Sequence, residues 1–192
     1  MKKSICAVFG VLFLFNTAFA MEDLLSFSAG ISSGIPVYGT NSLSNKIDFI
    51  ENKHRVIIGS LFTINLNPYQ QITFFTGGDI LSDFNWNSDS EYAHCLHISF
   101  PLGVKIYPNL AGFNLGIAYA LGFRADLSKT KGVGKDNNIA AWSNGFKFSA
   151  EYNFAHCGQS KFYPSIGLSW NLMPRGKKSY DNIFTFYVAE NF

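Results

Sequence analysis

Large apolar side chains occupy every second position of the segment FNLGIAYALGFR, residues 113–124. The positions between them carry Asn, Gly, Ala and Arg, which are small or polar. Because successive side chains of a β-strand point to opposite faces, this period of two predicts a strand with one apolar face. Whether that face meets a protein core or something outside the protein decides the fold class.

The same alternation recurs along the chain and predicts eight strands, of which the third is the least regular. Their length suits the ~9–11 residues that a tilted membrane-crossing strand needs. No amphipathic helix pattern competes with them. The expected strands are residues 25–32, 56–66, 71–81, 95–106, 113–124, 142–154, 165–172 and 184–192.

The connecting segments alternate between long and short. Short turns face the periplasm and longer loops face outward in transmembrane β-barrels, so the alternation predicts an antiparallel up-and-down sheet. The short turns are expected at residues 67–70, 108–110 and 157–160. The longer loops are expected at residues 34–53, 83–91, 128–138 and 174–181.

The polar face decides between two eight-stranded barrels. A soluble lipocalin-like barrel would place its apolar side chains inside and many Lys and Glu outside. Here the alternate face is mostly Gly, Ser, Ala, Asn and Thr, and only 15% of the 192 residues are charged. We therefore interpret residues 21–192 as an all-β, eight-stranded antiparallel up-and-down transmembrane β-barrel whose apolar side chains face lipid.

The first twenty residues predict a secretory signal peptide. Lys2 and Lys3 precede a short apolar run, and Ala18-Phe19-Ala20 has the small-x-small pattern of a cleavage site. The apolar run is shorter than the ~20 residues of a spanning helix. Removal of residues 1–20 takes two Lys from the formal net charge of +2, and nothing in the sequence suggests a nucleic-acid partner.

The chain ends IFTFYVAENF, and this end resembles the terminal strand that the barrel-insertion machinery recognises. Phe192, Val188, Phe186 and Phe184 match that signature, whereas Glu190 departs from it. With the signal peptide and eight strands, residues 21–192 resemble the small bacterial outer-membrane barrels of the OmpX, OmpW and OmpA-membrane-domain type. The segment ISFPLGVKIYP, residues 98–108, is similar to a strand-and-turn segment common among them. The resemblance implies a monomer in the outer membrane, in contact with its lipid.

A few charges lie on the predicted inner face. Buried charges must be paired, so we expect a salt-bridge network that closes the lumen. The alternative is a path for ions or solutes lined by the same groups, although eight strands leave an interior that side chains can fill. The candidates are Lys105, Arg124, Lys147, Glu151 and Asp79.

His97 and Ser99 share the inner face of one predicted strand. A nucleophilic serine needs a base within hydrogen-bond reach, and side chains two positions apart on a strand stand about 6–7 Å apart. We interpret both as lumen-lining residues. Cys95 and His97 are too few ligands for a zinc site, and no catalytic residue, metal or cofactor is predicted. Cys95 and Cys157 are expected at opposite ends of the barrel and therefore as free thiols.

Two loop types suggest contacts outside the barrel. The first long loop carries apolar residues such as Tyr38 and Ile50, which suit a fold-over lid or a host-contact surface. The segments SKTKGVGKDNN and PRGKKSYD are basic and suit acidic lipid headgroups or polyanions. Aromatic residues at strand ends suit interface girdles, with a ligand-stacking surface as the alternative; they are Trp142, Trp170, Tyr152 and Phe154.

Three functions remain open for such a barrel. The leading hypothesis is a narrow channel or carrier for small solutes, hydrophobic ones included, as the OmpW-like resemblance implies. The second is a non-conducting barrel that displays loops for adhesion to host surface molecules or for envelope integrity. The third and most remote is a lipid-modifying barrel enzyme.

Overall fold

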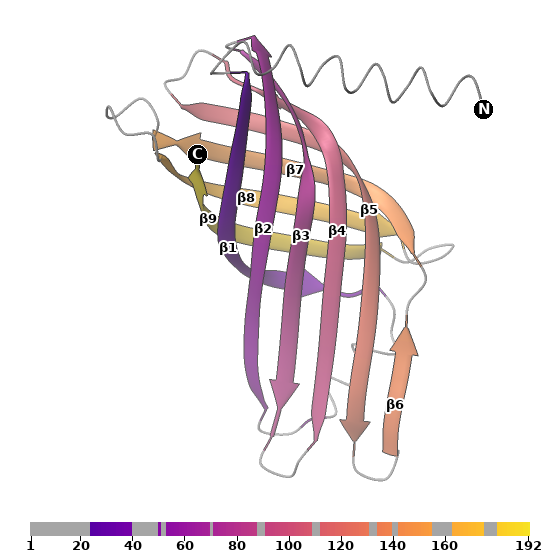
Figure 1. Cartoon of the computed structure of the whole chain (residues 1–192). Helices are drawn as coiled ribbons and strands as arrows, with labels where there is room; N and C mark the ends of the chain where they lie inside the picture. The colour runs from indigo at the N-terminus through magenta and orange to yellow at the C-terminus, as the bar shows by residue number, and fades with distance from the viewer. Residues whose placement is uncertain are drawn as a thin grey trace, which may run out of the picture.

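The computed structural model describes residues 24–39, 50, 53–69, 71–87, 91–108, 112–130, 134–139, 142–154, 163–174 and 180–192. The predicted signal peptide lies outside these residues. Among them no helix is long and apolar enough to cross a membrane. The strands, seen in Figure 1, are β1 (Leu25–Val37), β2 (His54–Tyr69), β3 (Ile72–Trp86), β4 (Tyr92–Ile106), β5 (Phe113–Thr130), β6 (Gly134–Ile139), β7 (Ser143–Asn153), β8 (Tyr163–Pro174) and β9 (Tyr180–Asn191).

The strands close into one antiparallel barrel. Neighbouring strands follow the order β4-β3-β2-β1-β9-β8-β7-β5, and pairing of β4 with β5 closes the ring. The first and last strands meet along β1 and β9, from Ser28 opposite Asn191 to Val37 opposite Asn182. The strand outside this ring of eight is β6, which among the described strands pairs only with β5. The predicted eight-stranded antiparallel barrel is therefore confirmed.

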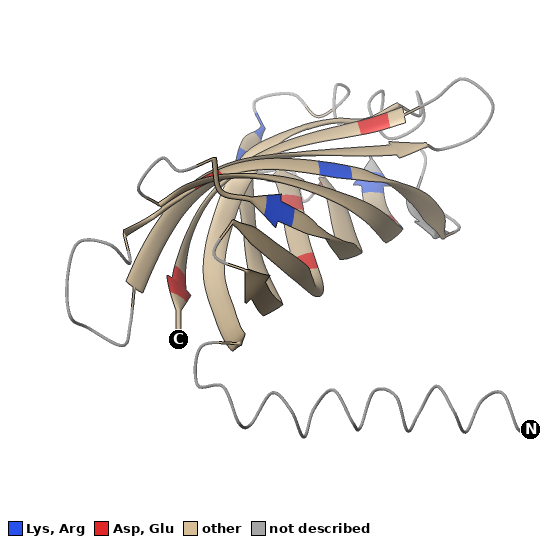
Figure 2. Cartoon of the chain, turned by 90° about the horizontal axis from the view of Figure 1, so that it is seen from above, with Lys and Arg blue, Asp and Glu red and all other residues tan. Residues whose placement is uncertain are grey.

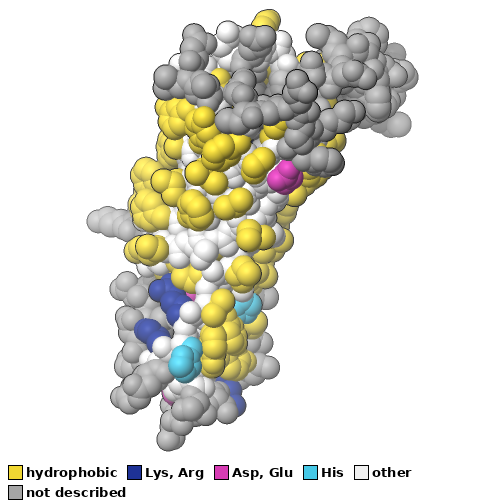
Figure 3. Space-filling view, turned by 90° about the vertical axis from the view of Figure 1, so that its left-hand side faces the viewer, with side chains coloured by type: hydrophobic (Ala, Val, Ile, Leu, Met, Phe, Trp, Pro, Cys, Tyr) yellow, Lys and Arg dark blue, Asp and Glu magenta, His cyan; other side chains and the backbone are white. Residues whose placement is uncertain are grey.

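The apolar faces point outward, as predicted. On β5 the exposed fractions of Leu115, Ile117 and Leu121 are about one half, whereas Asn114 and Ala120 are fully buried inside. The space-filling view in Figure 3 shows hydrophobic side chains over most of one face of the barrel. Such a surface is stable only against hydrocarbon, and closed barrels satisfy every strand edge within a bilayer. The protein is a transmembrane β-barrel.

Some expected loops proved to be strands. β3 runs to Trp86 rather than ending near residue 81, and β5 runs to Thr130. Most of the expected loop 128–138 forms a hairpin of β5 with β6. β5 changes partner along its length. Gly122 lies opposite Ser143 of β7, whereas Ala125 lies opposite Ile139 of β6, and the pairing register shifts by one residue between them. Here β6 takes the place of β7, and its sequence GKDNNI lacks the apolar alternation from which strands were predicted.

One side of the barrel projects beyond the other. β1 pairs with β2 only as far as Ser32 opposite Gly59, and then continues along β9. At this separation Ser33 Oγ donates to the Ile57 carbonyl oxygen at 2.7 Å. Figure 1 shows β2 to β6 extending past the ends of β1 and β7 to β9. The end with the longer connections therefore carries a one-sided sheet, which we call the projecting sheet.

Glycine permits close packing on the inner face. A Cβ atom on Gly77 would lie 1.9 Å from the Phe62 carbonyl oxygen, whereas one on neighbouring Gly78 would meet nothing nearer than the Phe100 ring at 3.9 Å. Gly112, before β5, has φ of 93°, a conformation that L side chains rarely adopt. These positions accept little but glycine, apart from Gly78.

Candidate functional site

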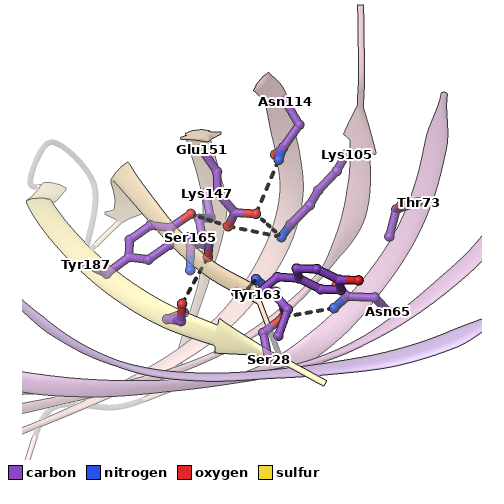
Figure 4. Close-up of polar contacts among 12 residues, drawn as sticks. Ser28, Asn65, Thr73, Lys105, Asn114, Lys147, Glu151, Tyr163, Ser165 and Tyr187 are labelled. Atoms are coloured by element: carbon purple, nitrogen blue, oxygen red, sulfur yellow. Dashed lines mark hydrogen bonds and ion pairs between the residues drawn. The ribbon is translucent and has the colours of Figure 1, made fainter. Parts of the chain in front are cut away.

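Ion pairs lie on the inner face of the barrel at four levels, which we call tiers and number from the end with the short turns. In tier one, Lys105 Nζ of β4 donates to both carboxylate oxygens of Glu151 on β7, at 3.2 Å each. Tyr187 of β9 donates to Glu151 Oε2 at 2.8 Å, and Asn114 of β5 donates to Oε1 at 3.2 Å. Figure 4 shows these side chains converging inside the barrel. Burial and the Glu151 carboxylate raise the pKa of Tyr107, in the adjacent turn, to about 12.

Tier two joins opposite walls of the barrel. Lys147 Nζ of β7 donates to Asp79 Oδ2 of β3 at 2.6 Å. Ser99 Oγ donates to the same oxygen at 3.3 Å. β3 and β7 are not neighbours in the sheet, so this direct contact shows how narrow the lumen is.

Tiers three and four lie in the projecting half. Arg124 Nη1 donates to Asp181 Oδ1 at 2.7 Å, and Arg124 Nη2 donates to Asp126 Oδ2 at 2.8 Å. In tier four Arg55 donates to both carboxylate oxygens of Asp83, Nε at 2.9 Å and Nη2 at 2.8 Å. The charged positions are few along the strands, as Figure 2 shows. In these tiers four cations are paired with five carboxylates.

The mouth above the tiers is covered by residues of the first long loop. Tyr38 OH donates to Asp83 Oδ2 at 2.6 Å, and its ring lies 5.3 Å from the Arg124 guanidinium carbon. Ile50 is 2% exposed and packs with Cys95. Burial, together with Cys95 and Asp83, raises the pKa of the Tyr38 hydroxyl. Both residues belong to the segment for which the sequence predicts a lid.

Two small cavities lie among the described lumen side chains. One cavity of about 10 Å³ is lined by Asp79, His97, Lys147 and Asn171 among others. Another of about 20 Å³ is lined by Thr63, Lys105, Lys147 and Glu151 among others. Since a water needs about 10–15 Å³ measured this way, each cavity has room for about one. Asp79 Oδ1, Asn171 Oδ1 and Thr63 Oγ1 have no protein hydrogen-bond partner, so water in these cavities would satisfy them.

All five charges predicted for the lumen lie inside the barrel. Lys105 pairs with Glu151 and Lys147 with Asp79, whereas Arg124 pairs with Asp126 and Asp181. The sequence interpretation missed four charged members of the tiers because they lie beyond the strand ends that it assigned: Arg55, Asp83, Asp126 and Asp181. If the alternation of each predicted strand is continued for a few residues past its assigned end, these four residues fall on the inner face.

His97 and Ser99 are both buried in the lumen. The Ser99 hydroxyl faces the ion-paired Asp79, and His97 lines the smaller cavity. The described residues contain no group of three or more His, Cys, Asp and Glu side chains placed to hold a metal ion. Cys95 is a buried free thiol. Its predicted separation from Cys157 lies outside the described residues.

The residues of the predicted insertion signal face outward in a row. Phe184, Phe186, Val188 and Phe192 are exposed by 41–51%, and Glu190 lies exposed among them. Phe192 exchanges two backbone hydrogen bonds with Phe27, at 2.8 and 2.9 Å. Their rings lie 6.3 Å apart. The signal residues therefore also belong to the seam that closes the barrel.

The aromatic residues predicted for girdles lie at or near strand ends. Trp142, which is 64% exposed, stacks against Phe100 with ring centroids 6.1 Å apart. Trp170 donates from Nε1 to Asn182 Oδ1 at 3.1 Å. Tyr152 and Phe154 pack edge to face at 4.9 Å. An apolar ring with a polar edge is the chemistry of a membrane interface.

The comparisons with known proteins rest on structure alone. Neither a protein-family model nor a curated protein matches the sequence. Ail, the attachment invasion locus protein of Yersinia pestis, has a similar structure with a TM-score of 0.56 at 10% identity, covering 88% of this chain and 97% of Ail. A complex of Ail with the heparin analogue sucrose octasulfate gives the same TM-score and coverage at 9% identity.

Neisserial surface protein A is also similar, with a TM-score of 0.50 at 11% identity, covering 87% of this chain and 94% of that protein. Identities this low show a shared fold. The apolar exterior, the closed ring of eight strands and the charged lumen agree with that fold. The chain is a small eight-stranded transmembrane β-barrel that shares its fold with Ail and Neisserial surface protein A.

Proposed function

We propose that this protein is a non-conducting barrel that displays its extracellular end for adhesion. The observation that carries the proposal is the four tiers of paired charges on the inner face of the barrel, beside two cavities that each have room for about one water. Passage of a solute would require several buried ion pairs to separate at once. Removing one partner of such a pair costs about 3–5 kcal/mol. This cost favours a structural role for the lumen charges over a path for solutes.

The ligand class that we propose is a sulfated polysaccharide. Asp83, Asp126 and Asp181 of the projecting half are all engaged by arginines inside the mouth. Each of these carboxylates therefore already has an arginine partner. The sequence of the two basic segments supplies five further cations: Lys131, Lys135, Arg175, Lys177 and Lys178. Ail, which shares the fold, has been crystallised with a heparin analogue, and this suggests the same probe.

The binding test uses purified barrel in detergent and sucrose octasulfate, followed by calorimetry at several salt concentrations. Changing Lys131, Lys135, Lys177 and Lys178 together to Gln should weaken binding at least about tenfold, with a shallower salt dependence, because exposed charges act through screened Coulomb attraction. The matched control is Lys161→Gln, in the segment at the opposite end of the barrel. Equal affinity of the two variants, or no binding at low salt, would refute the polyanion proposal.

Conductance separates this proposal from the channel or carrier hypothesis. Planar-bilayer recording of the purified barrel should show no unitary steps, and liposomes should take up no small solute. Regular steps or uptake would overturn the non-conducting proposal and favour transport. The enzyme hypothesis predicts altered membrane lipid composition in a His97→Ala, Ser99→Ala variant, whereas we expect none because Ser99 faces Asp79.

A further inference from the structure

The outer face of the projecting sheet carries a continuous aromatic strip with basic groups. Register places His54, Trp86, Tyr92 and Lys129 side by side across β2, β3, β4 and β5. The Phe84 ring lies beneath them, with centroids 5.2 Å from Trp86, 6.4 Å from Tyr92 and 5.5 Å from His94. We call these side chains the outer strip: His54, Phe84, Trp86, Tyr92, His94 and Lys129.

The strip lies above the hydrocarbon. From Ile106, near the short turns, to Tyr92 the strand β4 makes fourteen steps. At about 3.4 Å a step and a tilt of about 40°, this is a height of roughly 35 Å, against an apolar band of about 25 Å. The strip therefore stands at the level of the lipid headgroups. Figure 3 shows His side chains near the lower end of the molecule, next to hydrophobic side chains.

The aspartates on the described parts of β3 and β5 point away from the strip. Asp79, Asp83 and Asp126 of β3 and β5 all point into the lumen and are paired there. The described outward positions of β2 to β5 hold no acidic residue. His94 is held by Ser82, whose Oγ lies 2.7 Å from its Nε2. The outward face of these described strands thus offers the Lys129 ammonium group beside aromatic rings and hydrogen-bond donors.

The surface below the strip identifies its neighbour. Phe84 shares a row with Val56, His94 and Leu127, and the three apolar side chains of this row are exposed by 37–48% and connect the strip to the lipid-facing belt. A molecule on the strip would therefore lie beside the acyl chains that cover this belt.

We propose that the outer strip binds the phosphate-bearing headgroup of an outer-leaflet lipid. Lys129 and Tyr92, directly opposite each other on neighbouring strands, bind the phosphate. The rings of Phe84 and Trp86 contact the rest of the headgroup. This site is distinct from the loop cations proposed for a soluble polyanion, and its ligand belongs to the membrane that holds the barrel.

The test measures lipid selectivity of the reconstituted barrel by electron spin resonance. Vesicles of phosphatidylcholine contain a trace of spin-labelled phosphatidic acid in one sample and spin-labelled phosphatidylcholine in the other. A basic residue near a membrane surface attracts an anionic lipid by about 1 kcal/mol, so we expect about a fivefold preference for phosphatidic acid. Lys129→Gln should abolish most of it, and Tyr92→Phe should reduce it.

The matched control is Lys177→Gln, which removes the same charge from the loop between β8 and β9, across the barrel from β4. It should keep the lipid preference while weakening sucrose octasulfate binding, so the two proposals fail separately. Equal loss in Lys129→Gln and Lys177→Gln, or no preference in the unaltered barrel, would overturn the headgroup site.

Discussion

The pair of Lys105 and Glu151 gives the sharpest test of the lumen. Changing Glu151 to Gln keeps an acceptor for Tyr187, which donates at 2.8 Å, but leaves the Lys105 ammonium without a counter-charge. Removing one partner of a buried pair costs about 3–5 kcal/mol, so we expect a loss of unfolding free energy of that size. Lys105→Met should cost less, about 2–3 kcal/mol, because Glu151 keeps two hydrogen bonds.

The double variant distinguishes pairing from packing. Replacing both members of a buried pair by uncharged residues is often nearly neutral, so Lys105→Met with Glu151→Gln should lie within about 1 kcal/mol of the unaltered protein. The coupling free energy is then at least about 4 kcal/mol. Urea unfolding of the barrel refolded into vesicles, followed by tryptophan fluorescence, measures all four free energies.

The cycle has a built-in control. Lys105→Met combined with Asp83→Asn, which belongs to tier four, should be additive within about 0.5 kcal/mol because the sites share no partner. Additivity of the Lys105 and Glu151 substitutions would refute the reasoning, since it would mean that the lumen is wet enough to solvate each charge separately.

Three further predictions follow from the packing. Gly77→Ala should destabilise the barrel by at least about 2 kcal/mol in the same urea assay, whereas Gly78→Ala should change little, because only the first added methyl meets a backbone oxygen. Tyr38→Phe should accelerate maleimide labelling of Cys95 about tenfold, because loss of a hydrogen bond to a carboxylate loosens the lid. Phe192→Ser should reduce insertion by the assembly machinery in cells more than it reduces refolding in detergent.

Each of these three predictions can be contradicted by a specific result. Equal stability of the two glycine variants would mean that the β2 and β3 walls yield at Gly77. Cys95 labelling is measured with Cys157 changed to Ser, and Tyr69→Phe, at the other end of the barrel, must leave its rate unchanged. A parallel loss of cellular insertion and detergent refolding in Phe192→Ser would assign Phe192 to the seam alone.

The barrel was predictable because its signal repeats on every strand. In β5 apolar residues such as Leu115 face the lipid, and small or polar residues such as Asn114 face the lumen. The alternation therefore identifies the strand, and the residue types identify which of its faces points outward. The lumen pair of Lys105 and Glu151 was suggested only as members of a network. Which carboxylate meets which cation depends on how far the barrel walls approach, and alternation carries no such information.

The ends of the strands were harder to predict by the same means. Above the membrane neither face needs an apolar side chain, so β6 lacks the pattern, and the last residues of β5 show it only weakly. Asp126 and Asp181 were therefore assigned to loops, although they form tier three with Arg124. Composition suggested a fold-over lid or a host-contact surface for the first long loop, whereas the contact of Tyr38 with Asp83 required coordinates.

The hairpin of β5 and β6 has a practical consequence. Its turn, between Thr130 and Gly134, rests on a base of paired strands that continues into the barrel wall through β5. A foreign epitope grafted at this turn would be held clear of the bilayer on a stiff support. The graft would leave the lumen charges and the β1 to β9 seam untouched, so this barrel is a natural carrier for presenting peptides on a bacterial surface.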